Sequence, residues 1–195
     1  MTTTFEQKPL ILKFHKKLTD DEFFEFCQTN RDWRIEKSAS GEILIMAPTG
    51  SGTGKRNFSL AVQFGNWVER DGTGYGFDSS TGFTLPNGAI VSPDVAWIKV
   101  EKWNALSEEL QETFAPIVPD FVIELKSRSD SLSDLKEKMQ QYIDNGVSLA
   151  WLIDAAKRQV YVYSATVPVV VLNEPASVSG EPVLPGFVLD LQSIW

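Results

Sequence analysis

Two short motifs, Ser92-Pro93-Asp94 and Glu124-Leu125-Lys126, contain the residue types that a metal-dependent hydrolase needs. In an extended strand the residues i and i+2 share a face, so Glu124 and Lys126 would point the same way while Leu125 points oppositely. If Asp94 projects from a neighbouring strand, two carboxylates converge beside an ammonium group. Hard divalent cations prefer such oxygen ligands and keep waters that a phosphodiester can displace. The motifs therefore predict a site for Mg²⁺ or Mn²⁺.

Each residue of this predicted site has a distinct role. Asp94, Glu124 and the backbone carbonyl of Leu125 would hold the metal, which activates a bound water and polarises a phosphoryl oxygen. Lys126 would position the attacking water or stabilise the developing negative charge. A second Pro-Asp pair ends at Asp120, but this residue lies four positions before Glu124 on the same strand, about 13 Å away at about 3.3 Å per residue. One metal ion cannot bridge that distance, so Asp94 is the preferred first carboxylate.

Ordinary surface chemistry is the alternative explanation of both motifs. Pro-Asp is a frequent turn dipeptide, and Glu-x-Lys is common on the solvent face of an edge strand. However, Glu124 and Lys126 lie in an otherwise apolar segment, 121–127, which is typical of a central strand. An unpaired carboxylate would be costly there. The context therefore favours a paired or metal-bound Glu124.

The glycine-rich stretch MAPTGSGTGKRN, residues 46–57, raises the question of a phosphate-binding loop. That motif needs a glycine five positions before the Gly-Lys pair and a Ser or Thr directly after the lysine. Thr49 and Arg56 occupy these two positions, so we expect no nucleotide cofactor. We interpret the stretch as a mobile connection that leads into a helix. Its Lys55-Arg56 pair could contact the phosphates of a nucleic-acid backbone, as could the lysines within 13–17.

Local patterns predict the elements that must position these residues. Thr19 and Glu22 form a capping-box signature that begins a short helix. Segments 33–37 and 42–46 alternate like a hairpin around Gly41, and apolar residues from Phe58 to Val68 recur at helical spacing until Asp71-Gly72 ends the helix. Further strands are predicted at 74–83, 91–100, 121–127, 148–155 and 158–165, and further helices at 102–114 and 131–146. This order predicts a mixed α/β or α+β domain with one central sheet flanked by helices.

Composition limits the classes of protein and partner. A chain of 195 residues is most simply one domain, with a core at about 34–163 and a β-rich extension at 164–195. No apolar run approaches the roughly 20 residues of a membrane span, and the first ten residues do not resemble a signal peptide. We therefore expect a cytoplasmic protein without a membrane partner. Cys27, the one cysteine, cannot form an intramolecular disulfide, and His15, the one histidine, lies in a polar segment that argues against a Ser-His-Asp hydrolase.

The net charge of −8 argues against tight nonspecific binding to nucleic acid. It does not exclude a nuclease, because carboxylates that hold a divalent cation contribute to the negative count and are neutralised once the metal is bound. Most of the tryptophans are expected to pack the core rather than to stack bases.

Pro93-Asp94, followed thirty positions later by Glu124-Leu125-Lys126, resembles the PD-(D/E)XK nuclease signature. The surrounding stretches STGFTLPNGAIVSPDVAWI, PDFVIELKSRSDSLSDLKEKMQQYIDNG and LAWLIDAAKRQVYVY are similar to the Uma-two family of restriction-endonuclease-like proteins, from about residue 34 to 163. The resemblance implies a restriction-endonuclease-like core and a divalent-metal phosphodiesterase site. The acidic pair and the lysine of that site correspond to Asp94, Glu124 and Lys126.

The resemblance also points to the helix that follows the Glu-x-Lys strand. Related nucleases often place a Gln or Lys and a Tyr one turn apart there, and Lys138 and Tyr142 have this spacing, with two glutamines between them. We take both as candidate substrate-binding residues, together with Lys55 and Arg56. Glu36 and Glu42 on the first hairpin could supply a further carboxylate, although exposed hairpin charges explain them as well.

Two functional classes follow from the sequence. The first is a Mg²⁺- or Mn²⁺-dependent DNA endonuclease, which we expect to be a homodimer because cutting both strands of a duplex requires two sites. A single-stranded, branched or RNA substrate remains an alternative. The second is a nuclease-fold protein that binds nucleic acid or acts as an interaction module without cutting, a class that the acidic charge favours.

Overall fold

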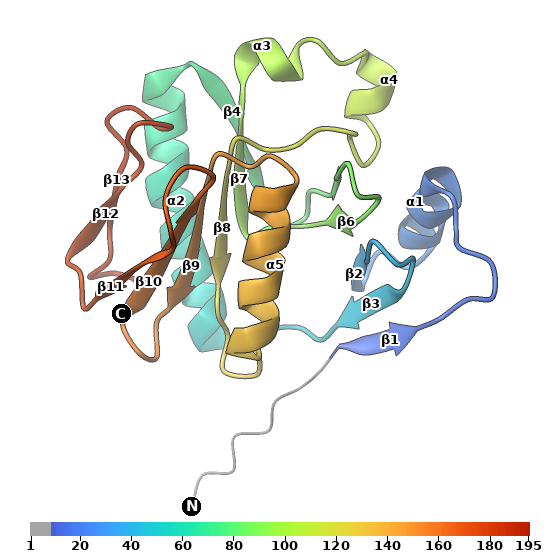
Figure 1. The fold of residues 1–195 in the computed structure, drawn as a ribbon, viewed down its shortest axis with the longest axis horizontal. Helices are drawn as coiled ribbons and strands as arrows, with labels where there is room; N and C mark the ends of the chain where they lie inside the picture. The colour runs from blue at the N-terminus through green and yellow to red at the C-terminus, as the bar shows by residue number, and fades with distance from the viewer. Residues whose placement is uncertain (1–8) are drawn as a thin grey trace, which may run out of the picture.

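A central six-stranded sheet runs through the protein, of which a computed structural model describes residues 9–195 (Figure 1). Its strand order is β11-β10-β9-β8-β7-β4, and it is mixed because β8 and β9 run parallel while the other neighbours are antiparallel. The strands are β4 (Gly74–Asp78), β7 (Val95–Lys99), β8 (Phe121–Leu125), β9 (Leu149–Asp154), β10 (Gln159–Ser164) and β11 (Val170–Asn173). The predicted mixed α/β fold with a central sheet flanked by helices is confirmed.

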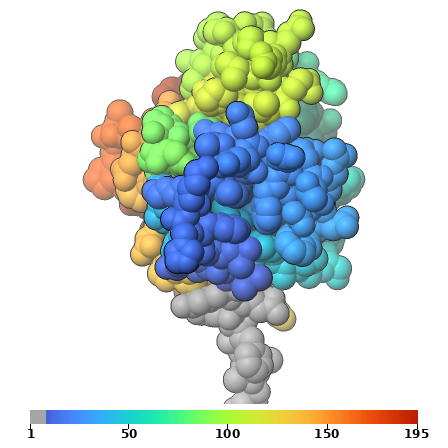
Figure 2. Space-filling model, turned by 90° about the vertical axis from the view of Figure 1, so that its right-hand side faces the viewer, coloured from blue at the N-terminus to red at the C-terminus, as the bar shows by residue number. Residues whose placement is uncertain are grey.

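A second sheet, which the sequence did not predict, contains the first hairpin. Its order is β1-β3-β2-β6-β5, and its strands are β1 (Leu10–Leu12), β2 (Arg34–Lys37), β3 (Ile43–Met46), β5 (Phe83–Thr84) and β6 (Ile90–Val91). The hairpin of β2 and β3 is confirmed, with Gly41 at a φ of +88° in the turn. Figure 2 shows that this N-terminal part of the chain covers one side of the molecule.

The described helices are α1 (Asp20–Thr29), α2 (Ser51–Asp71), α3 (Val100–Trp103), α4 (Glu108–Gln111) and α5 (Leu132–Asp144). The capping box that begins α1 is confirmed, since the amide of Glu22 donates to the Thr19 hydroxyl and the Thr19 amide donates to the Glu22 carboxylate. The single helix predicted at 102–114 is instead the last part of α3, a turn and the separate helix α4. None of the helices between residues 9 and 195 combines the length and the apolar character needed to cross a membrane.

The prediction of a mobile connection at residues 46–57 is wrong in its second half, because α2 already begins at Ser51 and includes Lys55 and Arg56. Gly50 is the N-cap, in an extended conformation. Glycines inside a helix each cost about 1 kcal/mol relative to alanine. The buried apolar stripe of the same helix, Leu60, Phe64 and Trp67, outweighs that cost. The predicted end of the helix is confirmed, since Gly72 adopts the left-handed conformation.

Apolar clusters cover both faces of the central sheet. Phe121, Ile123 and Leu125 of β8 belong to a cluster with the buried residues of α2, whereas Val122 belongs to a cluster with residues of α5. Glu124, two residues after Val122, therefore faces α5. The last hairpin, of β12 (Ser177–Ser179) and β13 (Val188–Asp190), contributes to the α2 cluster, while β11 extends the central sheet. The division of the chain into a core at 34–163 and an extension at 164–195 stays a prediction.

Candidate active site

The pairing of β7 with β8 brings the two predicted carboxylates together. The antiparallel register pairs Val95 with Ile123, so its continuation by one residue places Asp94 opposite Glu124. Pro93 has no amide hydrogen and lies in the gap between β6 and β7. Asp94 and Glu124 are both buried and line the same cavity, whose volume is about 270 Å³.

Glu124 is held by α5. The Tyr142 hydroxyl donates to Glu124 Oε1 over 2.9 Å, and Lys138 Nζ lies 2.8 Å from the same oxygen. Lys138 Nζ also lies 2.9 Å from Oε1 of Glu36, which is buried on β2. Lys138 and Tyr142 are one helical turn apart, which is the spacing that lets both side chains reach one acceptor.

Asp94 is held by backbone and by Arg34. The amide of Leu125 donates to Asp94 Oδ2 over 2.8 Å, and Arg34 Nη1 lies 3.4 Å from Asp94 Oδ1. Arg34 Nη2 also donates to the carbonyl of Ser92 over 2.7 Å, and the amide of Ser92 donates to Glu36 Oε1. The cluster thus contains three carboxylates and two cationic side chains, which leaves one excess negative charge.

The surroundings shift the ionisation of this cluster. Burial raises the pKa of Glu124 to about 6, although Lys138 acts in the opposite direction. Burial lowers the pKa of Lys138, but Glu124 and Glu36 outweigh this effect and hold that pKa above its usual value. Burial and the nearby Glu124 raise the pKa of Tyr142, so the phenol stays protonated and can donate to the carboxylate.

The structure does not bring Lys126 into contact with the acidic pair. Lys126 follows the last residue of β8, and its Nζ donates to the carbonyl of Ser127 over 3.0 Å. Among residues 9–195, the ammonium that contacts Glu124 is that of Lys138. Neither residue of the predicted phosphate-binding pair lines the cavity, although Thr53 and Asn57 of the same helix do. Lys55 is exposed on α2, and Arg56 Nε donates to the Ile194 carbonyl over 2.8 Å.

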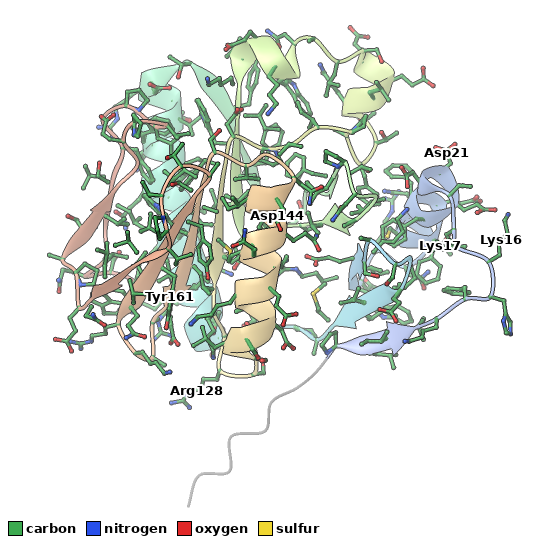
Figure 3. The ribbon with its side chains drawn as sticks, in the orientation of Figure 1. Lys16, Lys17, Asp21, Arg128, Asp144 and Tyr161 are labelled. Atoms are coloured by element: carbon green, nitrogen blue, oxygen red, sulfur yellow. The ribbon has the colours of Figure 1, made fainter. Side chains whose placement is uncertain are left out.

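Other acidic and basic candidates are engaged outside the cluster. Glu42 lies 2.5 Å from Lys13, and Figure 3 shows Lys16 and Lys17 beside α1, well away from α5. At the opposite end of β8 from Glu124, Asp120 accepts a hydrogen bond from the Lys99 amide. This position agrees with the expectation that Asp120 and Glu124 cannot bind the same metal ion.

Arg34 is the member of the cluster that sequence reasoning missed. It lies two residues before Glu36, so an alternating strand places both side chains on one face. That spacing was the available signal, but nothing local indicated that this face turns toward Asp94, sixty residues away.

The donor set fits a hard divalent cation that retains waters. Within residues 9–195 no three His, Cys, Asp or Glu side chains are arranged as a complete metal site. Mg²⁺ usually takes only one or two carboxylates and completes its shell with waters and phosphate oxygens. Oε2 of Glu124 accepts no hydrogen bond from any described residue, and the carbonyl of Leu125 points to the same side as its amide, toward Asp94.

Comparisons with known proteins agree with this fold. A family model named Uma2, described as "Putative restriction endonuclease", matches residues 20–192. A crystal structure from Anabaena variabilis, described as a "putative nuclease belonging to DUF820", superposes with a TM-score of 0.74 at 19% sequence identity. The superposition covers 91% of this chain and 97% of the other. No curated protein is similar enough in sequence to count as a match.

Proposed function

The chain belongs to the Uma2 family, and from this premise we propose that it is a Mg²⁺- or Mn²⁺-dependent endonuclease that hydrolyses phosphodiester bonds in DNA. One observation carries the proposal: two buried carboxylates, Asp94 and Glu124, line one cavity within a cluster that has an excess negative charge. Unpaired buried charge is costly unless a counter-ion binds. A divalent cation would supply that counter-charge.

In this proposal Asp94, Glu124 and the Leu125 carbonyl hold the metal, which when bound lowers the pKa of a water and polarises a phosphoryl oxygen. The protein's own contribution is to fix the ligands. The Leu125 amide and Arg34 orient Asp94, while Tyr142 and Lys138 orient Glu124 through Oε1, so that Oε2 would be available to a metal ion. Preorganised ligands of this kind lose no orientation free energy when the substrate arrives.

A lysine completes the proposed site by positioning the attacking water. Lys126 would have to leave the Ser127 carbonyl to take this role, whereas Lys138 already stands against Glu124. Arg128 lies on the loop between β8 and α5 and projects from the protein surface (Figure 3), where it could contact a substrate phosphate. Lys126→Ala and Lys138→Ala, assayed side by side, separate the two lysines.

A non-cutting protein is the second candidate function, and the cluster itself favours it. Lys138 and Arg34 already neutralise two of the three carboxylates, so the site is partly satisfied without metal. The homodimer is predicted only for the nuclease, because cutting both strands of a duplex requires two sites. Sedimentation of the purified protein, which gives its molar mass in solution, tests this prediction.

The decisive experiment is cleavage of plasmid and single-stranded DNA in Mg²⁺, Mn²⁺ or EDTA. Asp94→Asn and Glu124→Gln keep the shape of each side chain, and we expect each to lower metal-dependent cleavage by at least about a hundredfold. Asp120→Asn is the matched control, since Asp120 is equally buried but lies at the other end of β8. Calorimetric titration with Mn²⁺ gives a readout that is independent of turnover. Cleavage that persists in EDTA, or variants that cut as fast as the wild type, would contradict the proposal.

A further inference from the structure

A second cavity, of about 500 Å³, opens beside the proposed active site. Arg34 and Ser79 line both this cavity and the one that contains Asp94 and Glu124. Arg34 also contacts Asp94 directly. A ligand group in the second cavity would therefore lie one side chain away from a phosphate held at the acidic pair.

The walls of this cavity mix apolar and polar groups. The end of α1 and the residues that lead into β2 form one wall, and the turn between β4 and β5 forms another. Ile35 and Phe114 provide apolar surface, while Gln28, Ser79 and Ser80 provide hydrogen-bonding groups. A flat ring with a polar edge, such as a nucleobase, matches this combination, and the volume falls in the range of small-molecule sites.

Trp33 stands among these lining residues with 52% of its surface exposed. Trp97 and Trp151 are buried in the core, whereas the half-exposed ring of Trp33 is accessible to a ligand that enters the cavity. Arg31, the residue two positions before Trp33, is exposed. Its Nε donates to the carbonyl of Gln28, and its terminal nitrogens donate to no other described residue. Its terminal nitrogens can face a phosphate.

We propose that this cavity binds an unpaired nucleobase of the nucleic acid, stacked on Trp33, next to the phosphate at Asp94 and Glu124. The inference rests on the proposed function and narrows its substrate. Bases of an intact duplex are paired and stacked inside the helix, and extruding one into a cavity costs free energy that a single strand or an extrahelical base does not require. The substrate is then a single strand, or a duplex with an extrahelical base.

The test is binding of fluorescently labelled DNA to the full chain in EDTA, measured by anisotropy. Three probes of one sequence are compared: a single strand, its perfect duplex, and the same duplex with a one-nucleotide bulge. Stacking on an aromatic side chain contributes about 1–3 kcal/mol per base, so we expect Trp33→Ala to weaken binding of the single strand and the bulged duplex by about fivefold to a hundredfold. Binding of the perfect duplex should not change.

Two further variants serve as controls. One tests whether the effect of Trp33→Ala comes from lost stacking or from misfolding, and the other tests whether removing any exposed aromatic side chain weakens binding. Trp33→Phe should recover most of the affinity, because a smaller aromatic ring still stacks. Phe58→Ala is the matched control, since Phe58 is 71% exposed and lines neither cavity. A 2-aminopurine placed in the single strand should be quenched on binding to the wild type and to Trp33→Phe, but not to Trp33→Ala.

The outcomes distinguish this inference from the proposed function. Equal affinity of Trp33→Ala and wild type for the single strand, or equal affinity of the wild type for all three probes, would overturn the nucleobase site. The nuclease would still stand if the wild type cuts with metal and Asp94→Asn does not. Conversely, Trp33-dependent binding without any metal-dependent cleavage would keep the cavity and remove the catalytic proposal.

Discussion

Lys138→Met is the substitution that most directly tests how the acidic cluster is held. It removes the ammonium that lies 2.8 Å from Glu124 and 2.9 Å from Glu36, while the methionine keeps most of the lysine stem's packing. Two buried carboxylates then lose their shared partner. Breaking a buried ion pair in this way typically costs about 3–5 kcal/mol.

The loss of unfolding free energy has an upper limit, because a buried carboxylate that has lost its partner can bind a proton and become neutral. Protonating a carboxyl of ordinary pKa 4.5 at pH 7.5 takes three pH units, or about 4 kcal/mol at 1.36 kcal/mol per unit. In the wild type, burial already raises the pKa of Glu124 to about 6, and this shift costs about 2 kcal/mol of unfolding free energy at pH 7.5. The substitution can therefore remove about 2 kcal/mol more of unfolding free energy through Glu124, and Glu36 adds to that loss.

The raised pKa also fixes the direction in which stability changes with pH. A carboxyl whose pKa is raised in the folded state binds more protons there than in the unfolded chain, so stability falls as pH rises from 4.5 through the folded pKa. Removing Lys138 raises the pKa of Glu124 further, so stability continues to fall to a higher pH than in the wild type. We expect a loss of about 2–4 kcal/mol at pH 7.5 and much less at pH 5.5, where the wild-type Glu124 already binds a proton most of the time.

The assay is urea unfolding followed by tryptophan fluorescence, in EDTA, at pH 7.5 and 5.5. Lys136→Met is the control on the same helix, because Lys136 is exposed and its ammonium lies over the ring of Tyr161 in a cation-π pair. It should lose less than about 1 kcal/mol, independently of pH. The reasoning is refuted if Lys138→Met is as stable as the wild type at pH 7.5, or if it loses the same amount at both pH values, since the loss would then come from packing.

Three other predictions follow from single positions. Burial raises the pKa of the Cys27 thiol to about 11, so at pH 8 about one thousandth is thiolate instead of about one tenth; its reaction with a disulfide reagent should be about 100-fold slower in the native protein than in urea. Gly65→Ala should stabilise α2 by about 0.5–1 kcal/mol, because the added methyl meets nothing within 4 Å, whereas Gly74→Ala should lower the melting temperature, because its methyl would lie 2.3 Å from the Trp97 ring. Arg56→Ala should cost about 1 kcal/mol of unfolding free energy through its lost bond to the C-terminal segment, and a fall in DNA affinity without a loss of stability would contradict this placement.

Local elements could be predicted because their signals lie within a few residues of one another. The capping pair Thr19 and Glu22, the turn glycine Gly41 and the stop at Gly72 each act through the adjacent backbone. The start of α2 could not be predicted in this way, since glycine propensity favours a loop. The contacts that hold this helix are distant in sequence: Leu60, Phe64 and Trp67 pack against strands and the C-terminal hairpin, and nearer its start Arg56 donates to the Ile194 carbonyl.

The sequence by itself determined that Glu124 is unusual, because a carboxylate in an otherwise apolar strand must find a partner or a cation. It also singled out Asp94 over Asp120, since the extended length of one strand separates Asp120 from Glu124. Only the tertiary structure decided which groups meet them. The β7–β8 register sets Asp94 against Glu124, the packing of α5 on the sheet supplies Lys138 in place of Lys126, and the second sheet supplies Arg34. These partners lie 14 to 60 residues away, and strand pairing and helix packing, which no local pattern encodes, set the distances between them.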